Sequence, residues 1–564
     1  MTALVAQPPR IRAHGQRQVS LDVAHQRLMI IMLLFMAAVT LIAVRLLWLT
    51  VSTDASAGVR TISLIPKRGD IVDRNGQVLA RTIDAWSIGI HANKLLNDPE
   101  DLAPKLAALM PERSEADYLA ILQSGARFTY LRRRALPDLV AKINALGEPA
   151  MAYAREPERL YPQTTLAAHV LGYTDFDGRG VTGMERVLNA QLTDPQTRGR
   201  PVALSIDARV QAAMESELSA AMVDQQAKGA TGLVLDVHTG ELVSMVSLPV
   251  YNPNKPGEAS EDSRRNNVTQ SVYELGSTFK AITFAHAMDA GVVTSLGKRY
   301  DATQPVAVGR FRIKDDHPTG RWLNVPEALV HSSNIVTARI ADQLGAARME
   351  SIFRKLHFDT APDIELKERG RPIWPQDWGR ATVMTSGYGH GIAVTPLHLA
   401  NAYAALVNGG IWRPSTLMKI EPGKAPQGSR VFSAATSDRM RAMLRLVVLD
   451  GTGRKADADG LRVGGKTGTA EKAGAGGYAK HSTVSTFAGA FPMDAPRYVI
   501  IVMFDEPKGS AESAGQRTAG WVSAPVVSKV VSRIGPLLGV TPDVNSEMNL
   551  ADMTSLLWKP KGVR

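Results

Sequence analysis

Two residues that could act together on an acyl group, Ser277 and Lys280, lie three positions apart. The surrounding segment, Tyr273–Gly291, has small and apolar residues at helical spacing between two glycines, which predicts a mostly buried helix. On a helix the two side chains share one face, about one turn apart. A serine becomes a nucleophile when a base takes its proton, and a buried lysine can be that base because burial lowers its pKa.

The Ser-x-x-Lys spacing alone does not decide for catalysis, because both residues are common. The alternative interpretation, a helix N-terminus followed by an exposed lysine with no catalytic role, stays open at this point. The spacing recurs at Ser295 and Lys298. Gly297 lies inside that second pair, so we predict a loop without fixed side-chain geometry there.

A second short motif is Ser332-Ser-Asn334. Asn324-Val-Pro-Glu327, just before it, combines a cap, a proline and a third-position glutamate, which predicts the start of a helix. We expect that helix to end near His331, with Ser332 and Asn334 in the turn before a second helix that runs to Gly345. Alone, the motif is typical of a surface turn.

A third motif, Gly464-Gly-Lys-Thr-Gly-Thr-Ala470, carries the single lysine Lys466 between glycines. Together with Gly460 it matches the spacing of a phosphate-binding loop. Such a loop opens a helix, however, and this run continues as a strand. The pattern therefore does not favour nucleotide binding.

The order Ser-x-x-Lys, Ser-x-Asn, Lys-Thr-Gly is the set found in penicillin-binding proteins and class A β-lactamases. The chain resembles a class B penicillin-binding protein, a peptidoglycan D,D-transpeptidase, over nearly all of its length. Further landmarks of that family are Arg68-Gly69, Asp73-Arg-Asn-Gly76, Arg159-x-Tyr-Pro162, Gly183-x-Glu185, Ser386-Gly-Tyr-Gly-His-Gly391 with Thr395-Pro396, and Ala524-Pro525. We expect Gly387–Gly391 to form a backbone turn beside the site.

The resemblance implies that Ser277 attacks the carbonyl of the penultimate D-Ala of a stem peptide and becomes acylated. Lys280 is then the expected base. Ser332 would relay a proton to the leaving amine, and Asn334 would hold Lys280 and the substrate amide. β-Lactams, which mimic D-Ala-D-Ala, would acylate the same serine.

The Lys-Thr-Gly segment is implied to bind substrate through Thr467, Gly468 and Thr469, with Lys466 also facing the terminal carboxylate. The backbone N–H groups of Ser277 and Thr469 would form the oxyanion hole. We further expect Lys466 to lower the pKa of Lys280 by like-charge repulsion.

An apolar run of 24 residues, Leu28–Val51, is interrupted only by Arg45 and is long enough to cross about 30 Å of hydrocarbon. Four arginines and one aspartate precede it, so we expect the N-terminus in the cytoplasm and the rest outside, anchored in the inner membrane. A cleaved signal peptide ending at Ala55-Ser-Ala57 is the alternative, but the run is too long for one.

We predict a cytoplasmic tail (1–27), a transmembrane helix (28–51), an elongated pedestal domain (52–200), a transpeptidase domain (201–540) and a C-terminal tail (541–564). The pedestal should contain a helical subdomain between Glu100 and Ala145 and a helix from Glu185 to Leu192. The transpeptidase domain reads as α/β, with strands at both ends and helices between, hence a central antiparallel sheet covered by helices. The tail is polar and expected to be poorly ordered.

Composition narrows the remaining classes. The formal net charge is +11, but it is spread thinly, with Arg132–Arg134 the densest block, so we expect no nucleic-acid binding. There is no cysteine, which excludes disulfides and thiolate metal sites. The 12 histidines are scattered, and we expect no metal site and no cofactor.

Within the family, size and pedestal favour the septal, FtsI-type enzymes of cell division. An elongation-type transpeptidase, a D,D-carboxypeptidase with water as acceptor, and a non-enzymatic β-lactam sensor or division scaffold stay open as alternatives. The expected partners are stem peptides ending in D-Ala-D-Ala, β-lactams, a membrane lipid II polymerase of the SEDS type (FtsW-like) and other division proteins.

Overall fold

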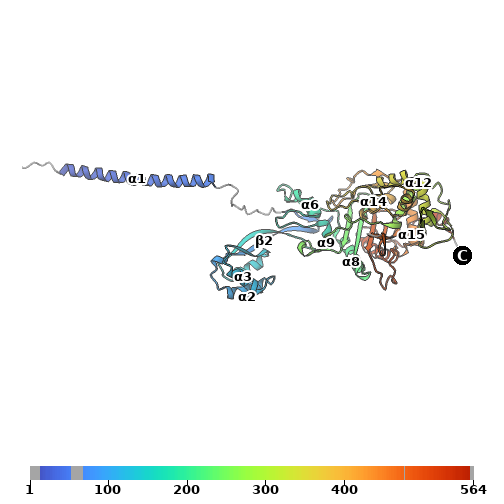
Figure 1. The fold of residues 1–564 in the computed structure, drawn as a ribbon, viewed down its shortest axis with the longest axis horizontal. Helices are drawn as coiled ribbons and strands as arrows, with labels where there is room; N and C mark the ends of the chain where they lie inside the picture. Colours follow the sequence, from blue (N-terminus) through green and yellow to red (C-terminus); the bar gives the residue numbers. More distant parts are fainter. Residues whose placement is uncertain (1–12, 53–67, 475–476, 559–564) are drawn as a thin grey trace, which may run out of the picture. The chain divides into compact units, whose positions relative to one another are not determined.

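The structure is a computed structural model and describes residues 13–52, 68–474 and 477–558 (Figure 1). The chain divides into two compact units, Met1–Leu64 and Ile65–Arg564. Each unit is described by itself below.

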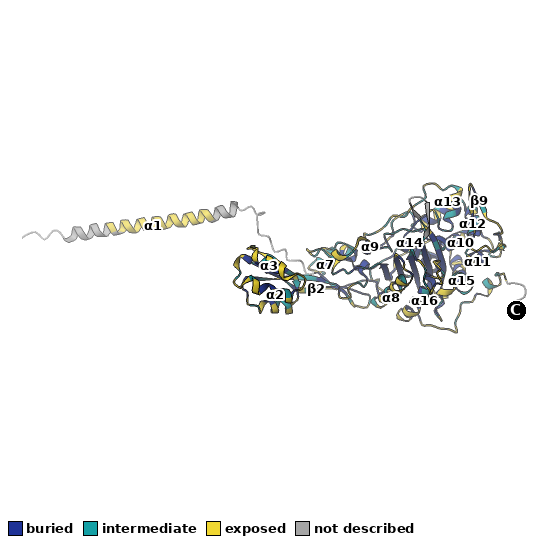
Figure 2. Cartoon of the chain, turned by 60° about the horizontal axis from the view of Figure 1, so that its bottom comes forward, coloured by how far each residue is buried: buried dark blue, intermediate teal, exposed yellow. Residues whose placement is uncertain are grey.

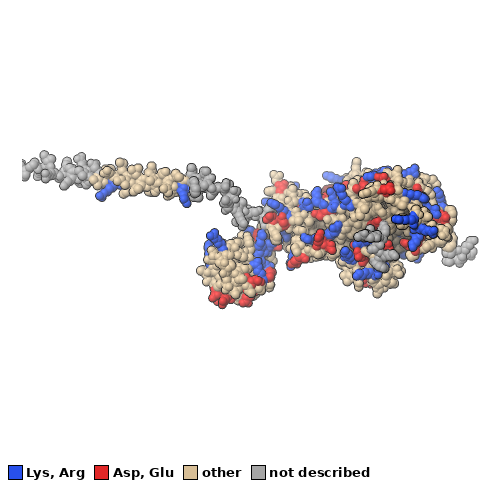
Figure 3. Space-filling view, in the orientation of Figure 1, with Lys and Arg blue, Asp and Glu red and all other residues tan. Residues whose placement is uncertain are grey.

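The first unit contains one long helix, α1 (Ala13–Ser52), which includes the predicted helix 28–51 and begins before it. Its segment His25–Arg45 has a mean hydropathy of 2.5 and none of it is buried by protein. Figure 2 shows this stretch as exposed, and in Figure 3 the middle of the helix is tan between two blue patches. The sequence has no charged residue between Arg27 and Arg45. Within the described ranges it is the one helix long and apolar enough to cross a bilayer.

The second unit begins with a small sheet, in the order β3-β2-β1-β5 with β4 also pairing β2. The strands are β1 (Ile71–Val72), β2 (Val78–Ile90), β3 (Thr129–Ala135), β4 (Met151–Leu160) and β5 (Val202–Ala203). The tight turn predicted after β1 is present, because the Asp73 carboxylate accepts from the N–H groups of Asn75 and Gln77. Gly76, with φ +87°, takes the left-handed position of that turn.

Three helices pack against the far end of β2: α2 (Pro99–Leu109), α3 (Glu115–Gln123) and α4 (Pro137–Asn144). The prediction of a purely helical insert is wrong, because β3 lies between α3 and α4. Alternation explains this strand: Leu131 is buried while Tyr130 is exposed, and β3 pairs antiparallel with β2.

The single helix predicted from Glu185 to Leu192 is two short ones, α6 (Gly183–Val187) and α7 (Asn189–Thr193). The side chain of Asn189 explains the break, because its Oδ1 accepts from Arg68 and from the Gly180 N–H. Those two bonds fix the start of α7 independently of α6.

The larger sheet has the order β14-β15-β16-β6-β7 and every pairing in it is antiparallel. Its strands are β14 (Gly464–Gly474), β15 (Gly477–Phe491), β16 (Tyr498–Asp505), β6 (Gly229–Asp236) and β7 (Leu242–Leu248). The predicted assembly of one antiparallel sheet from both ends of the domain is confirmed. β14, which carries Lys466, is an edge strand.

Strand alternation divides the core into two layers. On β16, Val499 and Ile501 face one cluster while Ile500 and Val502 face the other. The second layer is closed by α8 (Ala208–Asp224) and α16 (Ser523–Leu537), both predicted helices. The first is closed by α10 (Phe279–Asp289), α14 (Pro396–Val407) and α15 (Ala434–Asp450).

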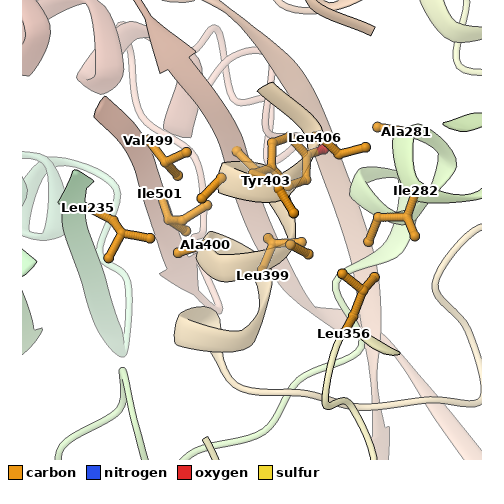
Figure 4. Packing of buried hydrophobic residues seen from close by; sticks show 14 of the residues in the cluster. Leu235, Ala281, Ile282, Leu356, Leu399, Ala400, Tyr403, Leu406, Val499 and Ile501 are labelled. Carbon is orange, nitrogen blue, oxygen red and sulfur yellow. The ribbon is translucent and has the colours of Figure 1, made fainter. Parts of the chain in front are cut away.

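Helix α14 lies between the sheet and α10 (Figure 4). Its buried side chains contact β6 and β16 on one side and α10 on the other. Figure 4 labels Leu399, Ala400, Tyr403 and Leu406 on α14, together with Leu235 on β6, Val499 and Ile501 on β16, and Ala281 and Ile282 on α10. Helix α10, which follows Ser277, is therefore held against the sheet by a fully buried apolar layer.

Shorter elements complete this unit. They are α5 (Ala168–Leu171), α9 (Glu261–Arg264), α11 (Val325–Val330), α12 (Asn334–Lys355), α13 (Arg380–Ser386), α17 (Ala551–Thr554), β8 (Tyr300–Asp301), β9 (Val306–Val308), β10 (Phe311–Ile313), β11 (Trp322–Leu323), β12 (Ile411–Trp412), β13 (Ser429–Arg430), and the 3-10 turns η1 (Ala92–Lys94), η2 (Pro256–Glu258), η3 (Gly276–Thr278) and η4 (Arg454–Ala456). α12 is kinked at Gly345, where the second predicted helix was expected to end.

The prediction of a poorly ordered C-terminal tail is wrong for residues 541–558. Leu550 is buried in the main core, and α17 follows it. Composition misled the prediction, because this polar segment packs Met548, Leu550, Met553 and Leu557 against the core and bonds its backbone to the buried side chains of Asn324 and Glu327.

Candidate active site

Ser277 lies on η3, a single turn that leads directly into α10. Gly276 before it has φ +55°, and a Cβ there would lie 2.8 Å from the carbonyl oxygen of Thr469. Behind the turn, the Tyr403 hydroxyl donates to the Thr278 carbonyl at 2.8 Å. The turn is thus held from both sides. Ser277 is half-exposed, and among the described residues its hydroxyl has no hydrogen-bond partner.

Lys280 is fully buried one turn into α10. Its Nζ donates to the Ser332 carbonyl oxygen at 2.5 Å and to the Ser332 Oγ at 3.1 Å. The first and second sequence motifs therefore meet, and the reading of Lys280 as an exposed helix residue is excluded.

Ser332 stands in the predicted turn between α11 and α12. Asn324 and Glu327 form a reciprocal capping box at the start of α11, and Ser333 caps α12 by accepting from the Val336 N–H. Ser332 itself has φ +58°, a left-handed conformation unusual for a residue other than glycine. This backbone directs both its carbonyl and its hydroxyl to the Lys280 amine.

Lys466 is also fully buried, on the edge strand β14. Its Nζ donates to the Ser332 Oγ at 3.0 Å and to the Thr467 carbonyl at 2.9 Å. All three motifs thus converge on one hydroxyl. At Gly468 a Cβ would lie 2.4 Å from the Leu275 carbonyl, so only glycine lets β14 pass this close to the Ser277 turn.

The two threonines of the third motif have partners of their own. The hydroxyls of Thr467 and Thr452 lie 2.6 Å apart. Thr469 Oγ1 accepts from the Ala519 N–H at 3.0 Å, just before α16. The end of the motif is therefore tied to the loop that precedes α16, while one edge of β14 stays without a neighbouring strand.

Burial lowers the pKa of Lys280 to about 7, against the opposing effect of the acids Asp315 and Asp316. The pKa of Lys466 is lowered well below its usual range, first by burial and then by the positive charge of Lys280. The predicted cause for Lys280 therefore needs correction: burial is dominant there, and like-charge repulsion acts visibly on Lys466. The Lys280 amine can therefore be neutral near pH 7.

Asp315 is a site residue that sequence reasoning missed. It is buried, its Oδ2 accepts from the Ser333 hydroxyl at 2.8 Å, and its Oδ1 accepts from the Ile335 N–H at 2.9 Å. It thereby fixes the first turn of α12 next to Ser332. Nothing in the sequence marks it, because a pair of aspartates in a polar loop is ordinary.

Asn334 begins α12, and its Nδ2 donates to the Lys314 carbonyl at 3.0 Å. In the described ranges no hydrogen bond joins it to Lys280, the contact expected from the resemblance. The amide oxygen of Asn334 is not engaged by that bond.

The glycine-rich stretch 387–391 is a backbone turn beside the site, as predicted. A Cβ at Gly389 would lie 2.3 Å from the Gly276 carbonyl, and the Thr283 hydroxyl on α10 donates to the Gly387 carbonyl at 2.7 Å. The second Ser-x-x-Lys pair, Ser295 and Lys298, lies in an exposed turn away from this cluster, also as predicted.

A cavity of about 680 Å³ adjoins the site without being centred on it. It begins at Tyr273 and Glu274, three residues before the nucleophile, and extends to Glu471 and Lys472 further along β14. Neither Lys280 nor Lys466 lines this cavity. No group of three His, Asp or Glu residues in the described ranges is arranged to hold a metal ion.

A second buried charged cluster lies in the pedestal and joins three landmarks of the sequence. Glu185 is fully buried; its Oε2 accepts from Arg68 at 2.5 Å and its Oε1 from Arg159 at 2.6 Å. Arg159 also donates to the Gly69 carbonyl at 2.8 Å, and Arg68 donates to Asn189 at 2.8 Å. The cluster ties β1, β4 and α6 together.

Comparison with known proteins agrees with this geometry. Residues 230–532 match the penicillin-binding protein transpeptidase domain, and residues 63–194 match the penicillin-binding protein dimerisation domain. The chain therefore belongs to the penicillin-binding protein transpeptidase family, and the two domains together make it a class B member, as the motifs predicted.

The chain is 41% identical over 483 residues to a probable peptidoglycan D,D-transpeptidase FtsI of Caulobacter vibrioides, covering 84% of this chain and 82% of the relative. It is 29% identical to the peptidoglycan D,D-transpeptidase FtsI of Escherichia coli K12, covering 84% of each. The crystal structure of penicillin-binding protein 3 from Mycobacterium tuberculosis, complexed with aztreonam, superposes with a TM-score of 0.67 at 24% identity, covering 85% of this chain and 97% of the other, and shows the shared fold.

Proposed function

We propose that the chain is a serine-type peptidoglycan D,D-transpeptidase of the septal type, acylated at Ser277. The observation that carries the site assignment is the convergence of two fully buried amines, Lys280 and Lys466, on the hydroxyl of Ser332. The relatives named FtsI support the septal type over the elongation type.

The acylation step follows from the protonation states. Neutral Lys280 takes the proton of Ser277, whose Oγ attacks the carbonyl carbon of the penultimate D-Ala. The C–N bond then breaks, and Ser332 passes a proton from the lysine pair to the amine of the departing D-Ala. The ester on Ser277 is next attacked by an amine of a neighbouring stem peptide, which forms the crosslink and returns the proton to the serine.

The open edge of β14 provides the binding surface for the stem peptide. A peptide can pair with the unpaired edge of a sheet as an added strand. Thr467 and Thr469 then face its terminal carboxylate, Gly468 permits the close approach, and Asn334 offers its amide to the peptide backbone. The N–H groups of Ser277 and Thr469 bind the oxyanion, at about 2.7–4 kcal/mol for each donor.

Replacement of Ser277 by alanine tests the assignment. We expect labelling by fluorescent penicillin to disappear while the protein still reaches the membrane fraction. The matched control is Ser295→Ala, which removes the serine of the second Ser-x-x-Lys pair and should leave labelling unchanged. Undiminished labelling of the Ser277 variant would refute the proposal. Depletion in cells should give filaments, whereas round cells would indicate an elongation role.

We propose that the N-terminus is cytoplasmic and that the domains after α1 are periplasmic. Because the chain has no cysteine, a single introduced one reports its own side of the membrane. Val223 is 78% exposed, so Val223→Cys should react with a membrane-impermeant maleimide in intact spheroplasts, whereas Thr2→Cys should not. The reverse pattern would overturn the orientation.

Of the proposed segments 1–27, 28–51, 52–200, 201–540 and 541–564, the third and fourth are supported by the two family matches, although β5 of the pedestal sheet lies just beyond residue 200. Limited proteolysis followed by mass measurement should cut near that boundary. We further propose that the pedestal and α1 contact a SEDS-type lipid II polymerase and other division proteins, which crosslinking in cells would detect.

A further inference from the structure

The C-terminal segment 543–558, which we name the strap, is anchored to the transpeptidase domain at two places. At the first anchor, Glu547 accepts from Arg445 on α15 through both carboxylate oxygens, at 3.0 and 2.5 Å. The guanidinium of Arg445 is buried, whereas Glu547 is partly exposed. Nearby, the Asp543 N–H donates to the Gly460 carbonyl at 3.0 Å.

The second anchor is at the start of α11. The Trp558 N–H donates to Glu327 Oε1 at 2.8 Å, and the Leu556 carbonyl accepts from Asn324 Nδ2 at 2.8 Å. Glu327 is buried and also accepts from Arg299 and Arg321, and Arg321 stacks over the Trp558 ring at 5.0 Å. The strap therefore bonds to both residues of the capping box of that helix.

Between the anchors the strap contributes apolar side chains to the main core. Leu550 is buried, and Met548, Met553 and Leu557 pack partly buried against the same cluster. This burial fixes the path of the strap from one anchor to the other, so the two anchors are connected by packed chain rather than by a free loop.

Each anchor holds one wall of the active site. Arg445, which is hydrogen-bonded to Glu547, donates to the carbonyl of Val463 at 2.7 Å. Val463 lies three residues before Lys466, which is on β14. Glu327 and Asn324 cap α11, whose last turn leads into Ser332. The strap thus joins the strand that carries one amine to the helix that precedes Ser332, whose hydroxyl lies between the amines.

We propose that the strap positions Ser332 and Lys466 relative to each other and so sets the rate of acylation at Ser277. This inference rests on the proposed function. Its residues touch no reacting atom; they act through Arg445 and the capping box. Small displacements of catalytic groups have large effects on rate, since a shift of about 1 Å can cost about 100-fold.

Two truncations of the full-length protein in detergent test the role of the strap. Ending the chain after Val540 removes both anchors, whereas ending it after Trp558 leaves both anchors in place. With fluorescent penicillin, we expect the first truncation to lower the acylation rate constant about tenfold at unchanged labelling amplitude, and the second to leave both unchanged. A purely structural strap would lower the amplitude and leave the rate constant unchanged, which would overturn the proposal.

Point variants keep the test decisive if the long truncation does not fold. Glu547→Ala should lower the rate constant several-fold, and Glu547→Gln, which still accepts from Arg445, should recover most of it. Glu512→Ala is the control, because Glu512 forms only an exposed pair with Lys529 at 3.8 Å. Equal rate constants for Glu547→Ala and the unaltered protein would also overturn the proposal. Loss of all labelling in Ser277→Ala is independent of these results, so the two proposals can fail separately.

Discussion

Two buried charged clusters of this molecule have opposite designs. In the pedestal, Glu185 lies between Arg68 and Arg159, and each guanidinium donates to the carboxylate. In the transpeptidase domain, Lys280 and Lys466 share a neutral hydroxyl, with no carboxylate bonded to either amine among the described residues. The charged groups of the pedestal cluster pair with each other. Within the part of the chain that the structure describes, the two lysines have no such partner, and burial lowers the pKa of each.

The difference shows which buried ionic groups can do chemistry. Arginine does not lose its proton in proteins, so neither guanidinium of the pedestal cluster can serve as a base. Lysine shifts its pKa readily when buried, and here the pKa of Lys280 falls to about 7. The paired cluster is therefore suited to a structural role, whereas a buried lysine without a carboxylate partner is suited to proton transfer.

The largest expected effect comes from replacing Lys280 with arginine. The variant keeps a positive charge and a donor at this position but removes the group that can accept a proton. We expect the acylation rate constant with fluorescent penicillin to fall by about 10²–10⁴-fold. A rate close to that of the unaltered protein would show that the lysine acts through its charge, and the contrast between the two clusters would fail.

Glu185→Gln should affect stability instead of rate. It leaves two buried guanidinium groups without their carboxylate, which typically costs about 3–5 kcal/mol. Urea unfolding of the purified protein measures the loss, and the acylation rate constant of the folded fraction should not change. The control is Glu112→Gln in the exposed pair with Arg132, expected to cost at most about 1 kcal/mol. A slower acylation in Glu185→Gln would contradict a purely structural role.

The pH dependence of the acylation rate constant is a third way to distinguish the roles of the two clusters. The base must be neutral, so the rate constant should rise about tenfold per pH unit below about 7 and level off above it. Stopped-flow labelling between pH 5 and 9 measures the curve. Folded Glu185→Gln protein should give the same midpoint, because that cluster lies in the other domain. A rate independent of pH across this range would exclude Lys280 as the base.

The smallest effect is expected on that midpoint in Lys466→Met. Burial is the cause that lowers the pKa of Lys280 to about 7, whereas the repulsion between the two lysines lowers the pKa of Lys466. Removing the neighbouring amine should therefore leave the midpoint near 7, while the rate falls because a donor to Ser332 is lost. Asp315 and Asp316, whose charges oppose the lowering at Lys280, stay unchanged. Stopped-flow labelling over the same pH range measures the midpoint, and a clear rise would show that the charge of Lys466 also acts on Lys280.

The parts of the fold that follow local periodicity were predictable from the sequence. Strands β6, β7 and β14–β16 alternate or run apolar, and the turn at Ser332 follows from the cap at Asn324. The candidate site residues could be named because three short motifs occur in one order. That both amines donate to the Ser332 hydroxyl was not predicted, because the motifs do not show which side chains bond each other.

What could not be predicted depends on contacts between distant and chemically ordinary residues. Asp315 is one aspartate of a polar loop, and only its bonds to Ser333 and Ile335 give it a role. The same holds for Glu547, whose partner Arg445 lies 102 residues away. The tail and β3 were misread for one reason: composition and local pattern do not show what a segment packs against.

The left-handed backbone at Ser332 has a further consequence. Glycine would adopt φ +58° freely, while serine does so at a conformational cost of about 1–3 kcal/mol. Glycine, however, brings no oxygen for the two amines to share. We therefore expect Ser332→Gly to remove the conformational strain of this turn and to abolish activity at the same time.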